Sequence, residues 1–197
     1  MALKIRKPQY KERGITWEDQ SVVQLASELD LEKHSFGGYF RETDRSKDKV
    51  VKKQLQIESG DYKDVERSES SVIHFLMTCD SPVNRFHVNV TSKCIYVLQR
   101  GSGVYVCIHP DGRLETFRVG FDVANGERTQ WVVEPGVYKA GYLVNSADAA
   151  NETATDLLWI TEIVVPGFDL DDMKFLDKKL LVEKVGSEQA AKLEFLL

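Results

Sequence analysis

The feature that most constrains this chain is a series of short apolar segments between residues 71 and 165, separated by turn signals. The segments are rich in β-branched and aromatic residues, which favour strands. Turn signals such as Pro110-Asp111-Gly112 and Pro135-Gly136 recur at the spacing typical of a sandwich or barrel. We therefore predict an all-β jelly roll, a fold whose two sheets can enclose a ligand. The segments are SVIHFLMT (71–78), KCIYVLQ (93–99), GVYVCIH (103–109), LETFRVG (114–120), QWVVEPG (130–136), YKAGYLV (138–144) and DLLWITEIVV (156–165).

Outside these segments the chain predicts a small amount of helix. Apolar residues recur at helical spacing over residues 17–29, after Thr16 as a helix cap, which predicts an N-terminal helix. Short helices are predicted at the C-terminal end, where SEQAAKLEFLL favours helix. Residues 1–15 are basic and polar and predict a flexible N-terminal arm, whereas the charged residues 47–67 favour a surface loop or a long twisted connection. Without repeats, residues 16–197 are predicted to form a single domain.

Charge and cysteine content exclude several classes of partner. The net charge of −5 argues against nucleic acid or an anionic membrane as the main partner. Three cysteines without CxxC spacing favour a reducing compartment, and no apolar run is long enough to span a membrane. We expect a cytoplasmic protein, with a nuclear location also open.

Two segments place polar side chains on a defined strand face. In HSFGGYFRET (34–43), Phe40 and Glu42 share one face and Arg41 points to the other. In NRFHVNV (84–90), His87 and Asn89 share a face. A histidine and an amide inside a barrel can move a proton and hold a substrate oxygen. The alternative, a polar outer face on an edge strand, is equally consistent with the spacing.

Three further residues are candidates for a pocket. Lys139 interrupts an apolar strand, so it either reaches back to solvent or serves as a cation inside the cavity. Trp131 and Tyr142 flank a Pro-Gly turn and either pack in the core or form an aromatic wall.

The histidines do not indicate a metal site. The chain has no His-x-His pair, which disfavours a metal site, and we expect no cofactor. His34 precedes a glycine turn and is expected to be exposed.

Several blocks of sequence resemble, in order, an uncharacterised RmlC-like family of the cupin superfamily, similar in fold to the dTDP-sugar epimerases. The resemblance covers residues 17–197 and implies a cupin double-stranded β-helix, a homodimer and a pocket inside the barrel. The blocks are HSFGGYFRETDRS, DSPVNRFH, LQRGSGVYV, HPDGRLETFRVGFDVANGERTQWVVEPGVYKAGYL and VVPGFDLDDMKFL.

The resemblance also implies roles for individual residues. Metal-binding cupins carry His-x-His and then Pro-x-Gly-x-x-His; here His87-Val88-Asn89 and Pro135–Lys139 keep one ligand, so no metal is expected. The epimerases are metal-free, with a histidine base and a tyrosine acid, and their Gly-x-Phe-x-Glu segment is similar to residues 38–42. By this likeness His87 is the base and Glu42 a ligand contact. The acid stays open between Tyr96, Tyr105 and Tyr142.

Three hypotheses follow. In the first, the barrel binds a small polar metabolite, a sugar or nucleotide-sugar, and isomerises it without a metal. In the second the protein is a binding module without turnover, and in the third it is a dimeric interaction scaffold. The first assigns His87 to catalysis. The residues assigned to binding are Glu42, Asn89, Lys139, Phe40, Arg41, Trp131 and Tyr142.

Overall fold

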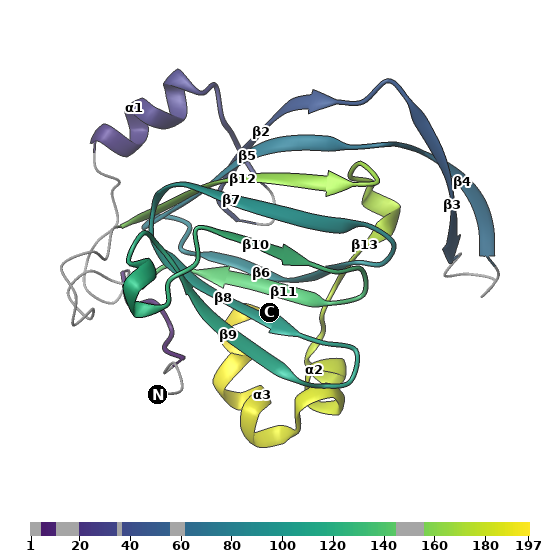
Figure 1. Ribbon diagram of the computed structural model, residues 1–197. Coiled ribbons are helices and arrows are strands. Elements are labelled where there is room, and N and C mark those ends of the chain that lie inside the picture. The colour runs from purple at the N-terminus through teal and green to yellow at the C-terminus, as the bar shows by residue number, and fades with distance from the viewer. Residues whose placement is uncertain (1–4, 11–19, 35–36, 56–61, 145–155) are drawn as a thin grey trace.

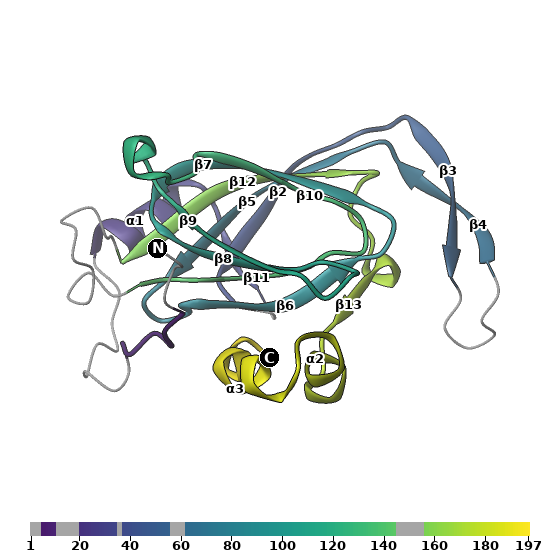
Figure 2. The ribbon, with the colours of Figure 1, turned by 60° about the horizontal axis from the view of Figure 1, so that its bottom comes forward.

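The computed structural model describes residues 5–10, 20–34, 37–55, 62–144 and 156–197, and these form two antiparallel sheets that face each other (Figures 1 and 2). Each of the seven predicted segments forms a strand, so the predicted all-β jelly roll is confirmed. The first sheet has the order β1 (Glu32–Lys33), β2 (Tyr39–Arg45), β5 (Ser71–Thr78), β12 (Leu157–Val165), β7 (Lys93–Gly101) and β10 (Gln130–Val133). The second has the order β13 (Met173–Phe175), β6 (Val83–Asn89), β11 (Tyr138–Tyr142), β8 (Gly103–Ile108) and β9 (Leu114–Val119).

Alternation along the strands divides the apolar residues between an inner and an outer core. Side chains that point between the sheets, among them Met77, Leu98 and Ile160, form the inner core. The residues next to them along each strand point outwards, and another part of the chain must pack over their apolar side chains. On the outer face of the second sheet that cover is provided by α2 (Lys178–Val185), α3 (Ser187–Leu193) and the 3₁₀ turn η4 (Glu194–Leu196), as Figure 2 shows.

The predicted N-terminal helix and short C-terminal helices are present. α1 (Gln20–Glu28) lies within residues 17–29 and packs Val22 against Leu76 and Leu157 on the outer face of the first sheet. The cap predicted at Thr16 lies outside the described residues. α2, which begins after Asp177, and α3 confirm the predicted short C-terminal helices. No helix within the described residues is long and apolar enough to cross a membrane.

Two polar segments differ from expectation. Instead of a loop, residues 47–67 contain an antiparallel ribbon, β3 (Lys49–Leu55) and β4 (Tyr62–Ser68), which projects from the barrel (Figures 1 and 2). The pattern missed it because a ribbon that meets water on both sides needs no apolar face. Residues 5–10 of the predicted N-terminal arm lie against the barrel, since Tyr10 is 1% exposed in the inner core.

Candidate functional site

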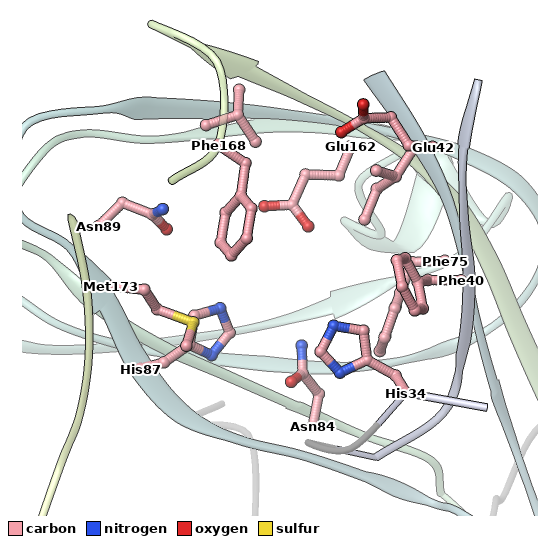
Figure 3. Close-up of a pocket in the computed structure, with 12 residues that line it drawn as sticks. His34, Phe40, Glu42, Phe75, Asn84, His87, Asn89, Glu162, Phe168 and Met173 are labelled. Carbon is pink, nitrogen blue, oxygen red and sulfur yellow. The ribbon is translucent and has the colours of Figure 1, made fainter. Parts of the chain in front are cut away.

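A cavity of about 90 Å³ lies between the two sheets (Figure 3). Its first wall comes from β2, β5 and β12, and its second from β6 and the start of β13, with His34 and Phe168 at the sides. The first wall is formed by Phe40, Glu42, Ile73, Phe75, Glu162 and Val164. The second is formed by Asn84, His87, Asn89 and Met173.

The first wall is built by strand register. Glu42 on β2 pairs with Ile73 on β5, which pairs with Glu162 on β12, so the two carboxylates flank one apolar side chain. The β2 ladder shifts register only after Glu42, between Glu42 and Asp44. Alternation therefore holds over residues 39–42 and turns both Phe40 and Glu42 into the barrel. The predicted shared face of Phe40 and Glu42 is confirmed.

Glu42 lies at the mouth of the cavity. Its carboxylate accepts two hydrogen bonds from Arg45, at 2.8 Å from Nε and 2.6 Å from Nη2, and its side chain is 37% exposed. The hydrogen bond to Glu42 raises the pKa of Arg45. Because Arg45 neutralises this carboxylate, the mouth carries little net charge.

Glu162 is the cavity residue that the sequence analysis missed. Its Oε1 accepts a hydrogen bond of 2.9 Å from the Tyr96 hydroxyl, and the Cys94 thiol also interacts with the carboxylate. Figure 3 shows the carboxylate directed into the cavity. Burial, with Cys94 and Glu162 nearby, raises the pKa of Tyr96 well above its usual range, so Tyr96 remains a donor. A glutamate inside the apolar DLLWITEIVV segment is the signal that would have identified it.

On the second wall, an irregularity in β6 brings two polar side chains to one face. Lys139 pairs with His87 and Gly141 with Asn84, so two residues of β6 stand opposite Ala140. This bulge lets Asn84 and His87 both face the cavity although they are three positions apart, a spacing that regular alternation would place on opposite faces. β6 lies between β13 and β11. The alternative of an outer face on an edge strand is therefore wrong for His87 and Asn89.

The His87 ring is held in one tautomer. Nδ1 lies 2.8 Å from the carbonyl oxygen of Arg85, which only accepts, so Nδ1 carries the proton and Nε2 presents a lone pair. Burial, followed by repulsion from the Lys139 ammonium, lowers the pKa of His87 to about 3 against the opposing effect of the Arg85 carbonyl. The imidazole is therefore neutral at physiological pH.

Lys139 lies behind Asn89 and is almost completely buried, with 1% of its surface exposed. Its Nζ donates to Oδ1 of Asn89, and it forms no ion pair with any carboxylate of the described residues. Because an ammonium only donates, this contact fixes the orientation of the amide. Nδ2 of Asn89 therefore lies on the other side, where it is buried without a hydrogen-bond partner.

These positions do not fit a metal ion. The described residues contain no group of three or more histidine, cysteine or acidic side chains that could hold one. The positions that correspond to the ligands of metal-binding cupins carry His87, Asn89 and Lys139, and the Lys139 ammonium contacts Asn89. A fixed positive charge there repels a second cation.

Four of the predicted binding residues do not line the cavity: Lys139, which lies behind Asn89, and three residues that lie farther away. Arg41 lies on the outer face and binds Asp30, as alternation requires. Trp131 packs deeper in the inner core, stacked on Tyr96 with ring centroids 5.0 Å apart. Tyr142 points to the outer core, where it meets Phe195.

The histidine expected to be exposed is also placed differently. His34 lines the cavity and meets Phe40 edge-on at 4.5 Å between ring centroids, and burial lowers its pKa. It reaches the barrel because β1 brings residue 33 into the first sheet beside Tyr39. Of the candidate acids, Tyr96 is bonded to Glu162, and Tyr105 packs against Trp131 at 4.7 Å.

The cavity therefore has two chemically different sides. The first wall offers acceptors, above all the carboxylate of Glu162. The second offers the Nε2 lone pair of His87 and the amide N–H of Asn89, with a buried positive charge behind that amide. Such an arrangement complements, in charge and hydrogen bonding, a small molecule that has both hydroxyl donors and an electron-rich oxygen.

Comparison with known proteins assigns the chain to one family. A model of the family described as "Cupin superfamily (DUF985)" matches residues 23–176. The uncharacterised protein YML079W of Saccharomyces cerevisiae is 46% identical over 178 residues, which cover 89% of this chain and 86% of that protein.

Two solved structures show the same fold. A hypothetical protein from Leishmania major has a TM-score of 0.71 at 24% identity, covering 88% of this chain and 97% of that one. Protein SO0799 from Shewanella oneidensis has a TM-score of 0.66 at 25% identity, covering 88% and 94%.

Proposed function

Because the chain belongs to the DUF985 family of the cupin superfamily, we propose that the interior of its barrel binds a small polar metabolite, such as a sugar or the sugar part of a nucleotide-sugar. The observation that carries this proposal is the unmet hydrogen-bonding capacity of the cavity wall. Nδ2 of Asn89 is buried without a partner, although buried polar groups are nearly always paired. A ligand that accepts from this amide completes the wall.

An isomerase activity is the finer form of this proposal. His87 and Glu162 lie on opposite sheets and face the same cavity, so a carbon atom held between them meets a proton acceptor on each side. One of the two groups removes the proton on its side, and the other, which enters the step protonated, returns a proton on the opposite side, so that a centre next to a carbonyl is inverted. A pKa of about 3 makes His87 a weak base in the empty barrel. An anionic ligand or enolate beside Lys139 offsets the ammonium charge and raises that pKa.

The binding proposal is tested by thermal unfolding in the presence of a panel of aldoses, ketoses, sugar acids and nucleotide-sugars. A true ligand raises the unfolding midpoint in a saturable way. We expect Asn89→Ala and Glu162→Gln to abolish that shift, and Arg41→Gln, on the outer face, to keep it. If no member of the panel shifts the midpoint, small-molecule binding is rejected and an interaction scaffold is favoured.

The isomerase proposal is tested by proton exchange. Incubation of the panel in D₂O with wild-type protein should place deuterium at the carbon next to the carbonyl of a substrate, detected by NMR. We expect His87→Asn to lose this exchange by at least about 100-fold, as for loss of a general base, while it still shows saturable binding. Binding without exchange by the wild type would identify a non-catalytic binding module.

A homodimer is a separate proposal, supported by the projecting ribbon of β3 and β4. An isolated two-stranded ribbon is marginally stable in water, and Val51 on this ribbon is 66% exposed. A groove of about 600 Å³ at its base is lined by residues of β3, β12 and the 134–135 turn. We infer that a second copy of the chain covers this ribbon.

A further inference from the structure

We propose that the cavity selects small hydroxy acids, with the carboxylate of the ligand on the Asn89 amide, backed by the Lys139 ammonium, and its neighbouring hydroxyl between His87 and Glu162. This inference deepens the proposed function and rests on it. It names the chemical class of the ligand from the charge and hydrogen-bond pattern of the two walls.

The negative charge of the ligand is inferred from the buried ammonium of Lys139. Side chains of Lys139 and Asn89 are 1% and 3% exposed, and no carboxylate among the described residues pairs with the ammonium. A buried charge without a counter-charge is costly, so an anion that enters beside it is strongly favoured. The ammonium also polarises the Asn89 amide through Oδ1, which makes its N–H a stronger donor. Since Nδ2 faces the cavity and has no partner, it is the atom that meets the anion.

The hydroxyl group of the ligand is inferred from the hydrogen-bond acceptors on the rest of the cavity wall. Nε2 of His87 presents only a lone pair, because Nδ1 holds the ring proton against Arg85. The Glu162 carboxylate, which faces the cavity, likewise accepts, and its two oxygens have more acceptor sites than the bond from Tyr96 uses. The ligand group next to the carboxylate must therefore donate, and an alcohol does so to either acceptor.

The size of the cavity limits the part of the ligand that is enclosed. At about 90 Å³ it is smaller than the ~150 Å³ apolar cavity that holds a benzene molecule. It therefore takes the carboxylate and the adjoining hydroxyl-bearing carbon. The rest of a longer acid extends towards Glu42, whose side chain is 37% exposed at the mouth.

The inference is tested by calorimetric titration of the full chain at pH 7 with matched acids and neutral polyols. The pairs are glycerate against glycerol and gluconate against glucose, with sodium sulfate as a general anion and serine as the corresponding amino acid. We expect each hydroxy acid to bind at least about tenfold more tightly than its neutral partner, the factor for one charge-assisted hydrogen bond.

Two variants test whether the second wall is responsible for the tighter binding of hydroxy acids. Lys139→Met removes the charge at similar length, and Asn89→Asp supplies an internal carboxylate for the ammonium while it removes the amide donor. Both should reduce hydroxy-acid affinity at least about tenfold. Asn89→Asp keeps the size of the side chain, so it tests the site even if Lys139→Met fails to fold. Arg41→Gln, which removes one exposed positive charge, should change nothing.

The outcomes separate this inference from the broader proposal. Neutral sugars that bind as well as their acids overturn the inference and leave small-molecule binding intact. Equal binding of sulfate, or tighter binding of serine, overturns the assignment of a hydroxy acid. If neither acids nor neutral compounds bind, both proposals fail together.

Discussion

The barrel holds His87 as a neutral imidazole, because burial and the Lys139 ammonium lower its pKa from 6.5 to about 3. Between these values the unfolded chain binds a proton that the native state does not. The stabilisation is therefore complete above pH 6.5 and is lost as the pH falls towards 3. We expect the free energy of unfolding to decrease over this interval by about 3–5 kcal/mol more in the wild type than in His87→Gln. Urea titrations at several pH values measure the two slopes, and equal slopes would contradict the prediction.

Burial of the Lys139 charge costs free energy, and this cost points to a ligand. Replacing a buried charge by an apolar side chain of similar size often stabilises a protein. We therefore expect Lys139→Met to raise the free energy of unfolding of the ligand-free protein by about 1–3 kcal/mol. Urea denaturation at pH 7 checks this, with Arg41→Met as the matched change of an exposed cation. A destabilised Lys139→Met would show that the ammonium serves the fold through Asn89.

At the scale of secondary-structure elements, the C-terminal helices and the cavity lie on opposite faces of the second sheet. Leu193 of α3 is completely buried there. We expect Leu193→Ala to cost about 2–5 kcal/mol, from the lost burial and the cavity it leaves, without changing ligand selectivity. Thermal and urea unfolding measure the loss. The neighbouring Lys192→Ala, in an exposed helical ion pair, should cost less than about 0.5 kcal/mol.

Elements with one buried face were predictable, and those without one were not. The strand β7 alternates buried and partly buried residues along most of its length, which is the pattern that the sequence displays. The ribbon of β3 and β4 has no such alternation and was taken for a loop. The residue range of helix α2 was not assigned from the sequence, because its first residues, Lys178 and Lys179, are charged and its single fully buried side chain is Leu181.

At the scale of the whole molecule, the projecting ribbon leads to a prediction about assembly. If a second copy covers it, a charge on its exposed apolar side chain weakens association. We expect wild-type protein to sediment as a dimer, and Val51→Asp to shift the equilibrium towards monomer by at least about tenfold, as burying an unpaired charge requires. Phe121→Asp is the control, because that side chain is 63% exposed far from the ribbon in sequence. A monomeric wild type would reject the dimer.

The sequence by itself determined the strands and the face that each polar side chain shares with its neighbours. Phe40 with Glu42, and His87 with Asn89, follow from the two-residue period of a strand. These relations are local, so no knowledge of the partner strands is needed to state them. The sequence also excluded Arg41 from the face of Glu42, as its contact with Asp30 confirms.

Only the tertiary structure decided which faces look inward and which distant residues meet there. The register of β2, β5 and β12 brings Glu162 into the same row as Glu42, and the bulge in β6 turns Asn84 to the side of His87. Pairing between β11 and β6 sets Lys139 beside His87 and against Asn89. Trp131 and Tyr142 belong to other parts of the core for the same reason. Register between strands far apart in sequence depends on the packing of the whole barrel, and no local pattern encodes it.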